Sequence, residues 1–464
     1  EDPVTYHQVV LEPITFPEPV PAPASLLLVG DAEATAAALA GLPEDLAAVT
    51  TVTTPEQMEG GERVETILYL PPAAEATDLD AVQAGMASYL AVAKGAARRL
   101  TPGGRLVVLA ANALAPHGVP VNPLAYAIFS SARVISMENP RVAVTAISDA
   151  DLDVVRAVGL GRAEELAGRK VLLSGDSLFD EAVRPHPTQL RQRLIAPDST
   201  VLVTGGFGGI GLEYVETLWR EYQAHSVVFG RRGLADLAAS DNEHDHARAA
   251  RLQALEAEGM RLRFVRCDLA DPGQVAAAVA GLREDGVTLR GVVHFAGVPD
   301  DGMLFRKEAA DLERVTGPKA LAAIALLREL DGVDFFLAAS TMTTITGGAG
   351  PIGYTVANTY PEGLARAGTN VSTVRWPGWK ETGMALAFGV ADAADDAFLI
   401  RSLPTAEGLE YVWRSHDGVF TDLIAGQVVK SITAKLTDSV RQLAADRRNA
   451  AMRDALLTLG AFVI

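Results

Sequence analysis

Short apolar runs alternate with alanine-rich stretches along roughly the first 150 residues of the chain. Strands of a parallel sheet are buried on both faces and read as short apolar runs, whereas the helices between them are longer and amphipathic. The alternation therefore predicts βαβ units. Strands are expected at Leu26–Val29, Ile67–Leu70, Leu106–Leu109 and Val142–Ile147, with helical stretches that include Ala34–Ala40 and Asp80–Arg99.

The segment before the first apolar run is rich in proline, at Pro13, Pro17, Pro19, Pro21 and Pro23. Proline lacks the backbone N–H that a helix interior or an inner strand needs. We therefore expect residues 1–25 to form an extended linker or an edge strand.

A second alternating series begins at Val201 and is more strongly punctuated by glycine. It predicts strands at Val201–Thr204, Ser226–Gly230, Arg261–Cys267, Gly291–His294, Phe335–Ala339 and Val371–Arg375. Helices fit between them at Gly209–Tyr222, Ala247–Glu258, Pro272–Arg283 and part of Leu304–Leu330.

The two series together predict an α/β protein of two Rossmann-like subdomains, each a doubly wound parallel sheet. The boundary is expected near residue 198, so that 1–198 form a structural subdomain and 199–464 a catalytic one. The first strand of the first series ends in Val29-Gly30-Asp31 without a glycine triad. We therefore expect the first subdomain to be degenerate and to bind no cofactor.

Composition narrows the classes of function. A formal net charge of −18 repels nucleic acid and anionic lipid, so neither is an expected partner. The only cysteine, Cys267, excludes an intramolecular disulfide and fits a reducing cytoplasm, and no metal-ligand cluster is present in the sequence. No apolar run reaches the roughly 18–20 residues of a membrane span.

A glycine-rich loop follows the first strand of the second series and precedes an amphipathic helix. Glycines let the backbone approach a pyrophosphate, and the helix N-terminus offers free N–H groups. The strand–loop–helix context favours a dinucleotide over a merely tight turn. The predicted cradle is Thr204, Gly205, Gly206, Phe207, Gly208, Gly209, Ile210 and Gly211.

The residues after the next strands favour NADPH as that dinucleotide. Arg231 and Arg232 follow the second strand, where paired arginines suit a 2′-phosphate and an acidic residue would suit NAD. Two solvated arginines are the alternative. Asp268, followed by Leu269, is placed to accept the adenine amino group, although an aspartate that caps a turn would look the same.

Reduction of a ketone by hydride needs a proton donor for the developing alkoxide. A tyrosine serves if its pKa is lowered, and a nearby cation favours the phenolate. Tyr354, Lys319 and Asn358 lie around the ends of the fourth and fifth strands, and Ser340 and Thr341 end the fifth. An ordinary half-buried aromatic, a surface lysine and a helix residue are the alternatives for the first three.

These residues carry a family resemblance. Thr204–Gly211, the run His294-Phe295-Ala296-Gly297, the pair Tyr354 and Asn358, and Trp376-Pro377-Gly378-Trp379 resemble a ketoreductase domain of a modular polyketide synthase. That family is part of the short-chain dehydrogenase superfamily. The likeness runs over most of residues 199–430, and the first half resembles the structural subdomain that precedes the catalytic one.

The resemblance implies roles for the catalytic residues. Tyr354 is the proton donor, Lys319 lowers its pKa and organises a proton relay, and Asn358 belongs to that relay. Thr341 stands at the position of the family's serine. Ser340 is the second candidate for that position, but adjacent strand residues point to opposite faces, and we prefer Thr341. Ala296 and Gly297 are carried over as cofactor contacts.

Three further residues are expected to orient the substrate. Pro299-Asp300-Asp301 resembles the family's acidic triplet, which correlates with the face from which the ketone enters, with proline in place of leucine. A solvated acidic turn is the alternative. Thr346 stands where the opposite class carries tryptophan, and we expect an L-configured hydroxyl product. Trp379 and Met384 belong to a stretch, Trp379–Ala387, that corresponds to a lid over substrate and nicotinamide.

The resemblance implies NADPH-dependent reduction of a β-keto acyl thioester held on an acyl carrier protein, with neighbouring synthase domains as further partners. Reduction of an α-keto acyl thioester in a nonribosomal depsipeptide synthetase uses the same chemistry and is the close alternative. A catalytically inactive scaffold is the other, because Thr341 and the run Thr359-Tyr360-Pro361-Glu362-Gly363 depart from the family pattern. A monomer is expected, since the first half covers the surface that free short-chain dehydrogenases use to associate.

Overall fold

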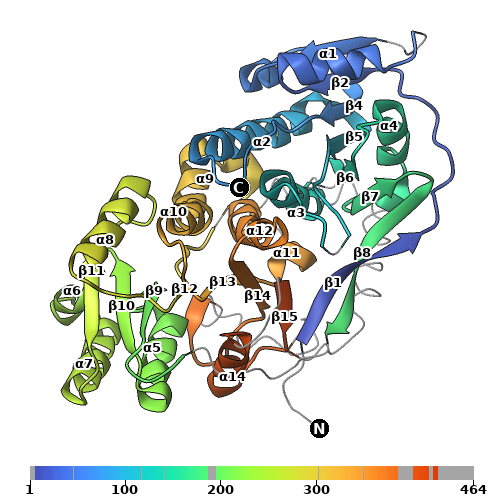
Figure 1. Cartoon of the computed structure of the whole chain (residues 1–464). Coiled ribbons are helices and arrows are strands. Elements are labelled where there is room, and N and C mark those ends of the chain that lie inside the picture. The colour runs from blue at the N-terminus through green and yellow to red at the C-terminus, as the bar shows by residue number, and fades with distance from the viewer. Residues whose placement is uncertain are drawn as a thin grey trace.

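The computed structural model describes residues 6–44, 46, 48–116, 118–139, 142–186, 195–300, 302–348, 350–384, 401–416 and 422–426. Fifteen strands of this part of the chain form one continuous, mostly parallel sheet. In Figure 1 the first half, blue to teal, lies above the second half, green to red. The predicted α/β class is confirmed, and the two sheets expected separately are joined into one.

The second half has the strand order of a doubly wound fold. The order is β11-β10-β9-β12-β13-β14-β15, so the direction of winding reverses between β9 and β12. The six predicted strands are present within two residues of their expected ends, and a seventh follows near the C-terminus. The strands are β9 (Thr200–Thr204), β10 (His225–Gly230), β11 (Leu262–Arg266), β12 (Gly291–His294), β13 (Phe335–Thr341), β14 (Val371–Trp376) and β15 (Asp422–Ala425).

The first half repeats the pattern in the order β8-β7-β6-β5-β4-β2-β3. The four predicted strands are present here as well. The sequence pattern missed β3, which is short and half exposed, and the antiparallel hairpin of β7 and β8. The strands are β2 (Leu26–Val29), β3 (Val49–Val52), β4 (Val64–Tyr69), β5 (Leu100–Ala110), β6 (Ala143–Asp149), β7 (Lys170–Ser174) and β8 (Ser177–His186).

The N-terminal strand corrects the expectation of a linker or an edge strand. β1 (Tyr6–Ile14) pairs antiparallel with β15 on one side and with β8 on the other, and so joins the two halves at the centre of the sheet. The prolines fall at or after its end: only Pro13 lies within it, in register with Phe179. Residues 6–12 therefore keep the N–H groups that an inner strand donates.

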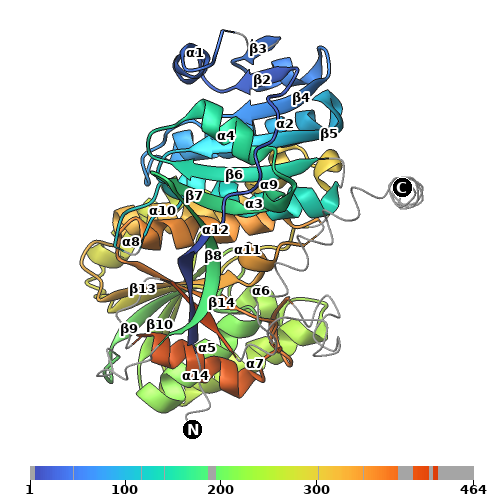
Figure 2. The same cartoon turned by 90° about the vertical axis from the view of Figure 1, so that its right-hand side faces the viewer.

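Helices cover both faces of the sheet, and one apolar core runs through both halves. That core includes residues of α2 and α3 from the first half and of α8, α10 and α12 from the second. On the opposite face α1 and α4 cover the first half, and α5, α7 and α14 cover the second. Figure 2 shows the halves stacked, with β1 and β8 crossing between them.

The helices of the first half are α1 (Ala32–Ala40), α2 (Leu79–Arg99), α3 (Pro123–Glu138) and α4 (Val154–Gly161), with 3₁₀ turns η1 (Pro55–Glu59) and η2 (Glu164–Leu166). Those of the second half are α5 (Gly209–Tyr222), α6 (Leu234–Ala238), α7 (Glu243–Ala257), α8 (Pro272–Glu284), the 3₁₀ turn η3 (Leu304–Arg306), α9 (Ala309–Thr316), the π-helix η4 (Gly317–Leu321), α10 (Ala322–Glu329), α11 (Thr343–Thr346), α12 (Ile352–Arg366) and α14 (Thr405–His416).

Helix α12 lies directly against α3 of the first half. A Cβ on Gly363 would lie 2.7 Å from the Cα of Pro123, so glycine permits this close approach. The Thr359 hydroxyl lies 2.9 Å from Ser130 Oγ on α3. α12 also continues through Pro361, the proline that the sequence placed near the relay. The first half therefore supports the helix that carries Tyr354.

Candidate functional site

The glycine loop between β9 and α5 is packed so tightly that a side chain would not fit at two of its positions. Gly205 has φ +70°, and a Cβ there would lie 2.9 Å from the backbone nitrogen of Ala296. A Cβ on Gly211 would lie 2.2 Å from the carbonyl oxygen of Gly205. Both glycines are therefore required by the turn itself, before any ligand is considered.

The N-terminus of α5 opens at this loop. The helix begins at Gly209, its N-cap is Gly208, and no side chain caps it. The N–H groups of its first turn are therefore available to an anion. Thr382 and Gly383 lie over the loop, since a Cβ on Gly209 would come within 2.7 Å of each. The expected lid segment thus reaches the predicted phosphate site.

The remaining loop residues line its base. Gly206 faces Val228 of the neighbouring strand β10. Phe207 is buried and stacks on Phe264, with the ring centroids 5.6 Å apart. These aromatic contacts fix the outer turn of the loop, while Ile210 approaches Gly383.

The two arginines predicted to select the cofactor differ in their surroundings. Arg232 donates to the carboxylate of Asp245 at 2.7 Å. Arg231 is exposed, and its guanidinium has no partner among the described residues. Only Arg231 is therefore free to meet a phosphate without giving up an existing ion pair.

Asp268 caps a turn, which is the alternative weighed for it. Its Oδ1 accepts the backbone N–H of Ala270 at 3.0 Å. Leu269 is buried, at 6% exposure. The adenine contact of Asp268 stays a prediction, and Leu269 contributes packing in this structure.

A buried histidine links the glycine loop to Lys319. His294 Nε2 lies 3.0 Å from the Lys319 carbonyl oxygen, which can only accept, so Nε2 carries the proton. His294 Nδ1 then accepts from the Thr204 hydroxyl at 2.7 Å. Thr204 in turn accepts the N–H of Ala296 at 3.2 Å. His294 was not among the predicted site residues, although it begins the run His294-Phe295-Ala296-Gly297 that carries the family resemblance.

Lys319 lies on the π-helix, next to α12. Its side chain is buried, and Nζ donates to the His294 carbonyl oxygen at 3.2 Å. Gly297 lies beside this side chain, since a Cβ there would be 3.9 Å from Lys319 Cδ, an ordinary van der Waals distance. Burial disfavours the ammonium and lowers the pKa of Lys319 to about 7.

Tyr354 and Thr341 form a hydrogen-bonded pair. Tyr354 lies in the first turn of α12, and its hydroxyl is bonded to the hydroxyl of Thr341 at the end of β13. Burial raises the pKa of Tyr354 to about 12, and the bond to Thr341 opposes that rise. The lowered tyrosine pKa expected from Lys319 is not found, because the ammonium is directed to the His294 carbonyl and desolvation dominates at the phenol.

The other two candidates around Tyr354 have backbone or remote partners. Asn358 donates its side-chain amide to the carbonyl oxygen of Tyr354 at 2.8 Å, one turn earlier in α12. Ser340 points away from Thr341, as alternation along a strand requires, and donates to Glu362. The geometry thus brings Thr341, and not Ser340, to the phenol.

Asp300 holds the start of α12 in place and was not recognised in the sequence as doing so. Its Oδ2 accepts the N–H groups of Gly353 at 2.7 Å and Tyr354 at 3.2 Å. Its Oδ1 accepts from the buried Lys307 ammonium at 2.6 Å. Glu138 of α3 ties the same two loops by accepting the N–H groups of Leu304 and Gly350. The acidic triplet was the sequence signal that could have drawn attention to Asp300. Its bonds to distant parts of the same chain could not be predicted from the sequence.

The structure describes two of the three residues expected to orient the substrate. Trp379 is 2% exposed and packs over Gly408 of α14, so it can shape a pocket only through its neighbours. Met384 is 36% exposed at the end of the described lid segment. Asp301 lies outside the described residues.

The residues that the structure describes contain neither a metal-binding cluster nor a membrane-spanning helix. No group of three or more histidine, cysteine, aspartate or glutamate side chains there is arranged to hold a metal ion. Within the same residues, every helix is too short or too polar to cross a bilayer.

Comparison with known proteins finds a family match in the second half of the chain. A family model described as the KR domain matches residues 199–381. Polyketide synthase ThaG of Burkholderia thailandensis is 34% identical over 231 residues, which are 47% of this chain and 4% of that relative. The chain therefore spans only a small part of that curated relative.

Solved structures share the fold of nearly the whole chain. A structure described as an A1-type ketoreductase is 22% identical with a TM-score of 0.74, over 96% of this chain and 99% of that one. A multidomain structure of a keto acid-selecting NRPS module, with adenylation, ketoreductase and pseudo Asub domains, is 16% identical with a TM-score of 0.78, over 94% of this chain and 40% of that one. At these identities the likeness is one of fold.

Proposed function

Since this chain belongs to the ketoreductase family of the polyketide synthases, with residues 199–381 as the matched domain, we propose that it reduces a β-keto acyl thioester to the β-hydroxy thioester with NADPH. The observation that carries the proposal is the hydrogen bond between Tyr354 and Thr341. The π-helix that carries Lys319 lies next to the helix of Tyr354, and the glycine loop belongs to the same half of the protein.

The residues around the loop fit a dinucleotide. The uncapped N-terminus of α5 supplies N–H donors, the close contacts of Gly205 and Gly211 keep the backbone bare, and the free Arg231 suits a 2′-phosphate. Bound there, NADPH supplies the hydride, with its electron pair, to the carbonyl carbon. Thr204, held by His294 and Ala296, fixes the loop to the end of β12.

The proton comes from this chain. With a pKa of about 12, the Tyr354 hydroxyl stays protonated at neutral pH, yet it yields its proton to an alkoxide, which is a much stronger base. Thr341 holds the phenol and offers a second hydroxyl to the substrate oxygen. Lys319, with a pKa of about 7, gains or loses a proton near neutral pH and serves as the reservoir that restores Tyr354.

The partners follow from the same family. An acyl carrier protein presents the thioester, and neighbouring synthase domains supply and receive it. A cytoplasmic location suits that assembly. The packing of α3 on α12 supports a monomer, because it occupies a face of the catalytic half that would otherwise be open to a second copy. The L configuration of the product stays a prediction, since Asp301 lies outside the described residues.

The test is NADPH oxidation by the full chain with a small β-keto thioester, followed by chiral analysis of the alcohol. We expect saturable NADPH consumption, more than a hundredfold reduced in Tyr354→Phe, which loses the proton donor. An α-keto thioester assayed in parallel separates the depsipeptide alternative. Tight NADPH binding without reduction of either substrate would establish the scaffold alternative instead.

A further inference from the structure

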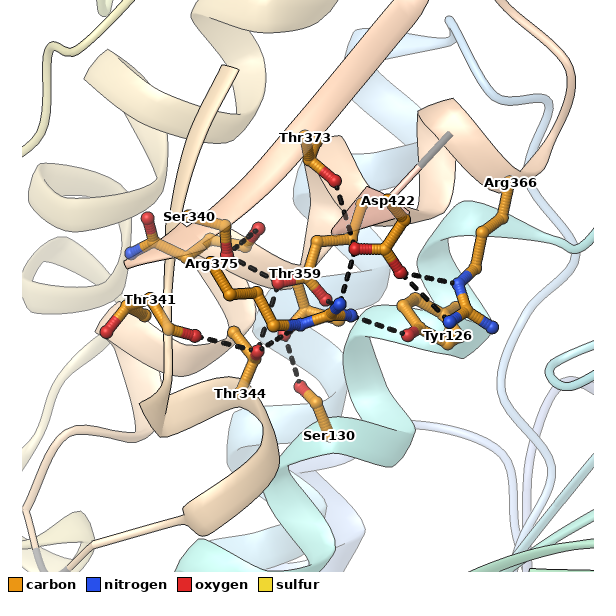
Figure 3. Close-up of polar contacts among 12 residues, drawn as sticks. Tyr126, Ser130, Ser340, Thr341, Thr344, Thr359, Arg366, Thr373, Arg375 and Asp422 are labelled. Carbon is orange, nitrogen blue, oxygen red and sulfur yellow. Dashed lines mark hydrogen bonds and ion pairs between the residues drawn. The ribbon is translucent and has the colours of Figure 1, made fainter. Parts of the chain in front are cut away.

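We propose that Thr344 is a positioning residue that fixes Thr341 against Tyr354, and that a buried charge cluster centred on Arg375 holds Thr344 in turn. The inference rests on the proposed function and adds to it a residue outside the predicted site. Figure 3 shows Arg375 between Thr344, Tyr126 and Asp422, with Thr341 on the far side of Thr344.

Arg375 of β14 is buried, at 1% exposure, and its donors are divided among four side chains. Nη1 donates to Asp422 of β15, and Nη2 donates to Glu362 of α12 at 2.5 Å. Nη2 also reaches the Tyr126 hydroxyl of α3 at 3.2 Å. The fourth, Thr344, accepts from Nε at 3.0 Å. The rigid fork of the guanidinium thus determines where Thr344 lies.

The bond from Arg375 also determines where the Thr344 proton points. An arginine N–H can only donate, so Thr344 Oγ1 accepts it and directs its own single proton elsewhere. The acceptors within reach are the Thr341 carbonyl oxygen at 2.9 Å and Glu362 Oε1 at 3.0 Å. Glu362 Oε1 already accepts the Ser340 hydroxyl, so we assign the Thr344 proton to the Thr341 carbonyl oxygen, which ties that backbone to the cluster.

That tie acts on the end of a strand. Thr341 is the last residue of β13. The next N–H, that of Met342, still donates to the Trp376 carbonyl oxygen at 3.1 Å, and the chain then turns into α11. The Thr341 hydroxyl reaches Tyr354 only if the backbone of Thr341 keeps its present conformation. Glu362 anchors the adjacent residue, Ser340, by accepting its hydroxyl proton. The two anchors hold the strand end from both sides.

The buried charges of the cluster are not explained by their contribution to the free energy of folding. Buried ion pairs are often no more stabilising than apolar residues of the same size, and their best-attested use is to specify one arrangement. Here Glu362 and Arg375 are both buried and belong to different elements, and Asp422 is shared with Arg366. Specifying the geometry of the strand end is a use that fits their location.

The experiment compares Thr344→Val with Thr145→Val in the full chain, with NADPH and a small β-keto thioester. Both substitutions replace a buried threonine hydroxyl by a methyl group. Thr145 of β6 bonds to the carbonyl oxygens of Gly161 and Leu166 in the first half, which makes it the matched control. We expect about a tenfold loss of kcat in T344V, with KM and the Kd for NADPH unchanged, and wild-type kcat in T145V.

Rescue separates positioning from mere packing. Thr344→Ser restores the hydroxyl, and we expect its kcat to return towards the wild-type value. T344A removes the same hydroxyl and replaces T344V if that variant does not fold. Wild-type kcat in T344V or T344A, or an equal loss in T145V, would overturn the positioning role. A wild type that binds NADPH but oxidises none of it would overturn the proposed function itself.

Discussion

Asp300 caps the helix that carries Tyr354. Its Oδ2 accepts the N–H of Tyr354 at 3.2 Å and that of Gly353 at 2.7 Å, two donors of the first turn of α12 that have no partner within the helix. A Cβ on Gly353 would lie 2.9 Å from this oxygen, so glycine makes the contact possible. The charge of Asp300 is balanced by Lys307 at 2.6 Å, with both side chains at most 2% exposed.

The Asp300–Lys307 pair leads to a stability prediction. Asp300→Asn removes one charge and leaves the Lys307 ammonium buried without a counter-charge from Asp300. Breaking such a pair from one side costs about 3–5 kcal/mol. We expect the free energy of unfolding of D300N, measured with urea, to fall by that order, and kcat to fall with it because the start of α12 shifts.

The double variant provides the control for that prediction. D300N combined with Lys307→Met removes both charges, so it should be more stable than D300N alone. Simple addition of the two single losses would show that the two side chains do not interact.

Thr341 is predicted to contribute a hydroxyl that a methyl group cannot replace. Thr341→Val keeps the shape but loses the bond to Tyr354, which holds the tyrosine pKa down against burial. We expect kcat to fall by about 100-fold, as for other donors to a developing oxyanion, and Thr341→Ser to keep most of the activity. Steady-state kinetics with NADPH and a β-keto thioester measure both.

Ser340→Ala tests the alternative assignment of the same role. The Ser340 hydroxyl bonds to Glu362 and not to Tyr354, so we expect S340A to lower stability more than T341V does, and kcat less. A larger loss of kcat in S340A than in T341V would reverse the assignment.

Lys319 makes the stability of the protein depend on pH in a defined direction. Burial lowers its pKa from 10.5 to about 7. Between these values the unfolded chain keeps a proton that the folded protein has released, so stability rises as the pH rises through this window.

The slope is measured by urea unfolding of the wild type and of Lys319→Met at pH 7.5 and 8.5. We expect the wild type to gain about 1 kcal/mol per pH unit relative to K319M, which has no amine to titrate. Equal slopes for the two proteins would mean that the buried amine keeps its ordinary pKa.

Arg231 and Arg232 are predicted to differ in cofactor selection. Arg231→Ala removes the free guanidinium, and we expect the KM for NADPH to rise about tenfold while that for NADH stays the same. Arg232→Ala removes a side chain already paired with Asp245, so its effect on the KM for NADPH should be smaller. An equal rise in both variants would show that the 2′-phosphate recruits both arginines.

The strands that the sequence predicted are those whose burial is set locally. β12 and β2 are short strands that are buried on both faces, and their predicted ends match the structure. β1 and β8 mix polar and apolar residues, and they pair with each other from opposite ends of the first half, so the local pattern does not reveal them. Their place at the centre of the sheet followed only from pairing with β15.

The glycine loop, Tyr354 and Lys319 were readable from sequence because their spacing from strand ends is a local property of a βαβ unit. The contacts that hold them were not. Glu138, Asp300 and Lys307 come from different loops and helices, and Arg375 meets Thr344 only because β14 lies beside β13. Residue type and spacing carry no information about such long-range neighbours.

By itself, the sequence determined the α/β class and predicted a loop suited to a dinucleotide and residue types suited to reducing a ketone, since periodicity and short motifs act over a few residues. Tertiary structure alone decided which hydroxyl meets Tyr354, where the Lys319 amine is directed, and that the first half supports the helix that carries Tyr354. Those outcomes depend on desolvation and on hydrogen bonds between segments far apart in the chain, and both exist only after the sheet has closed around β1.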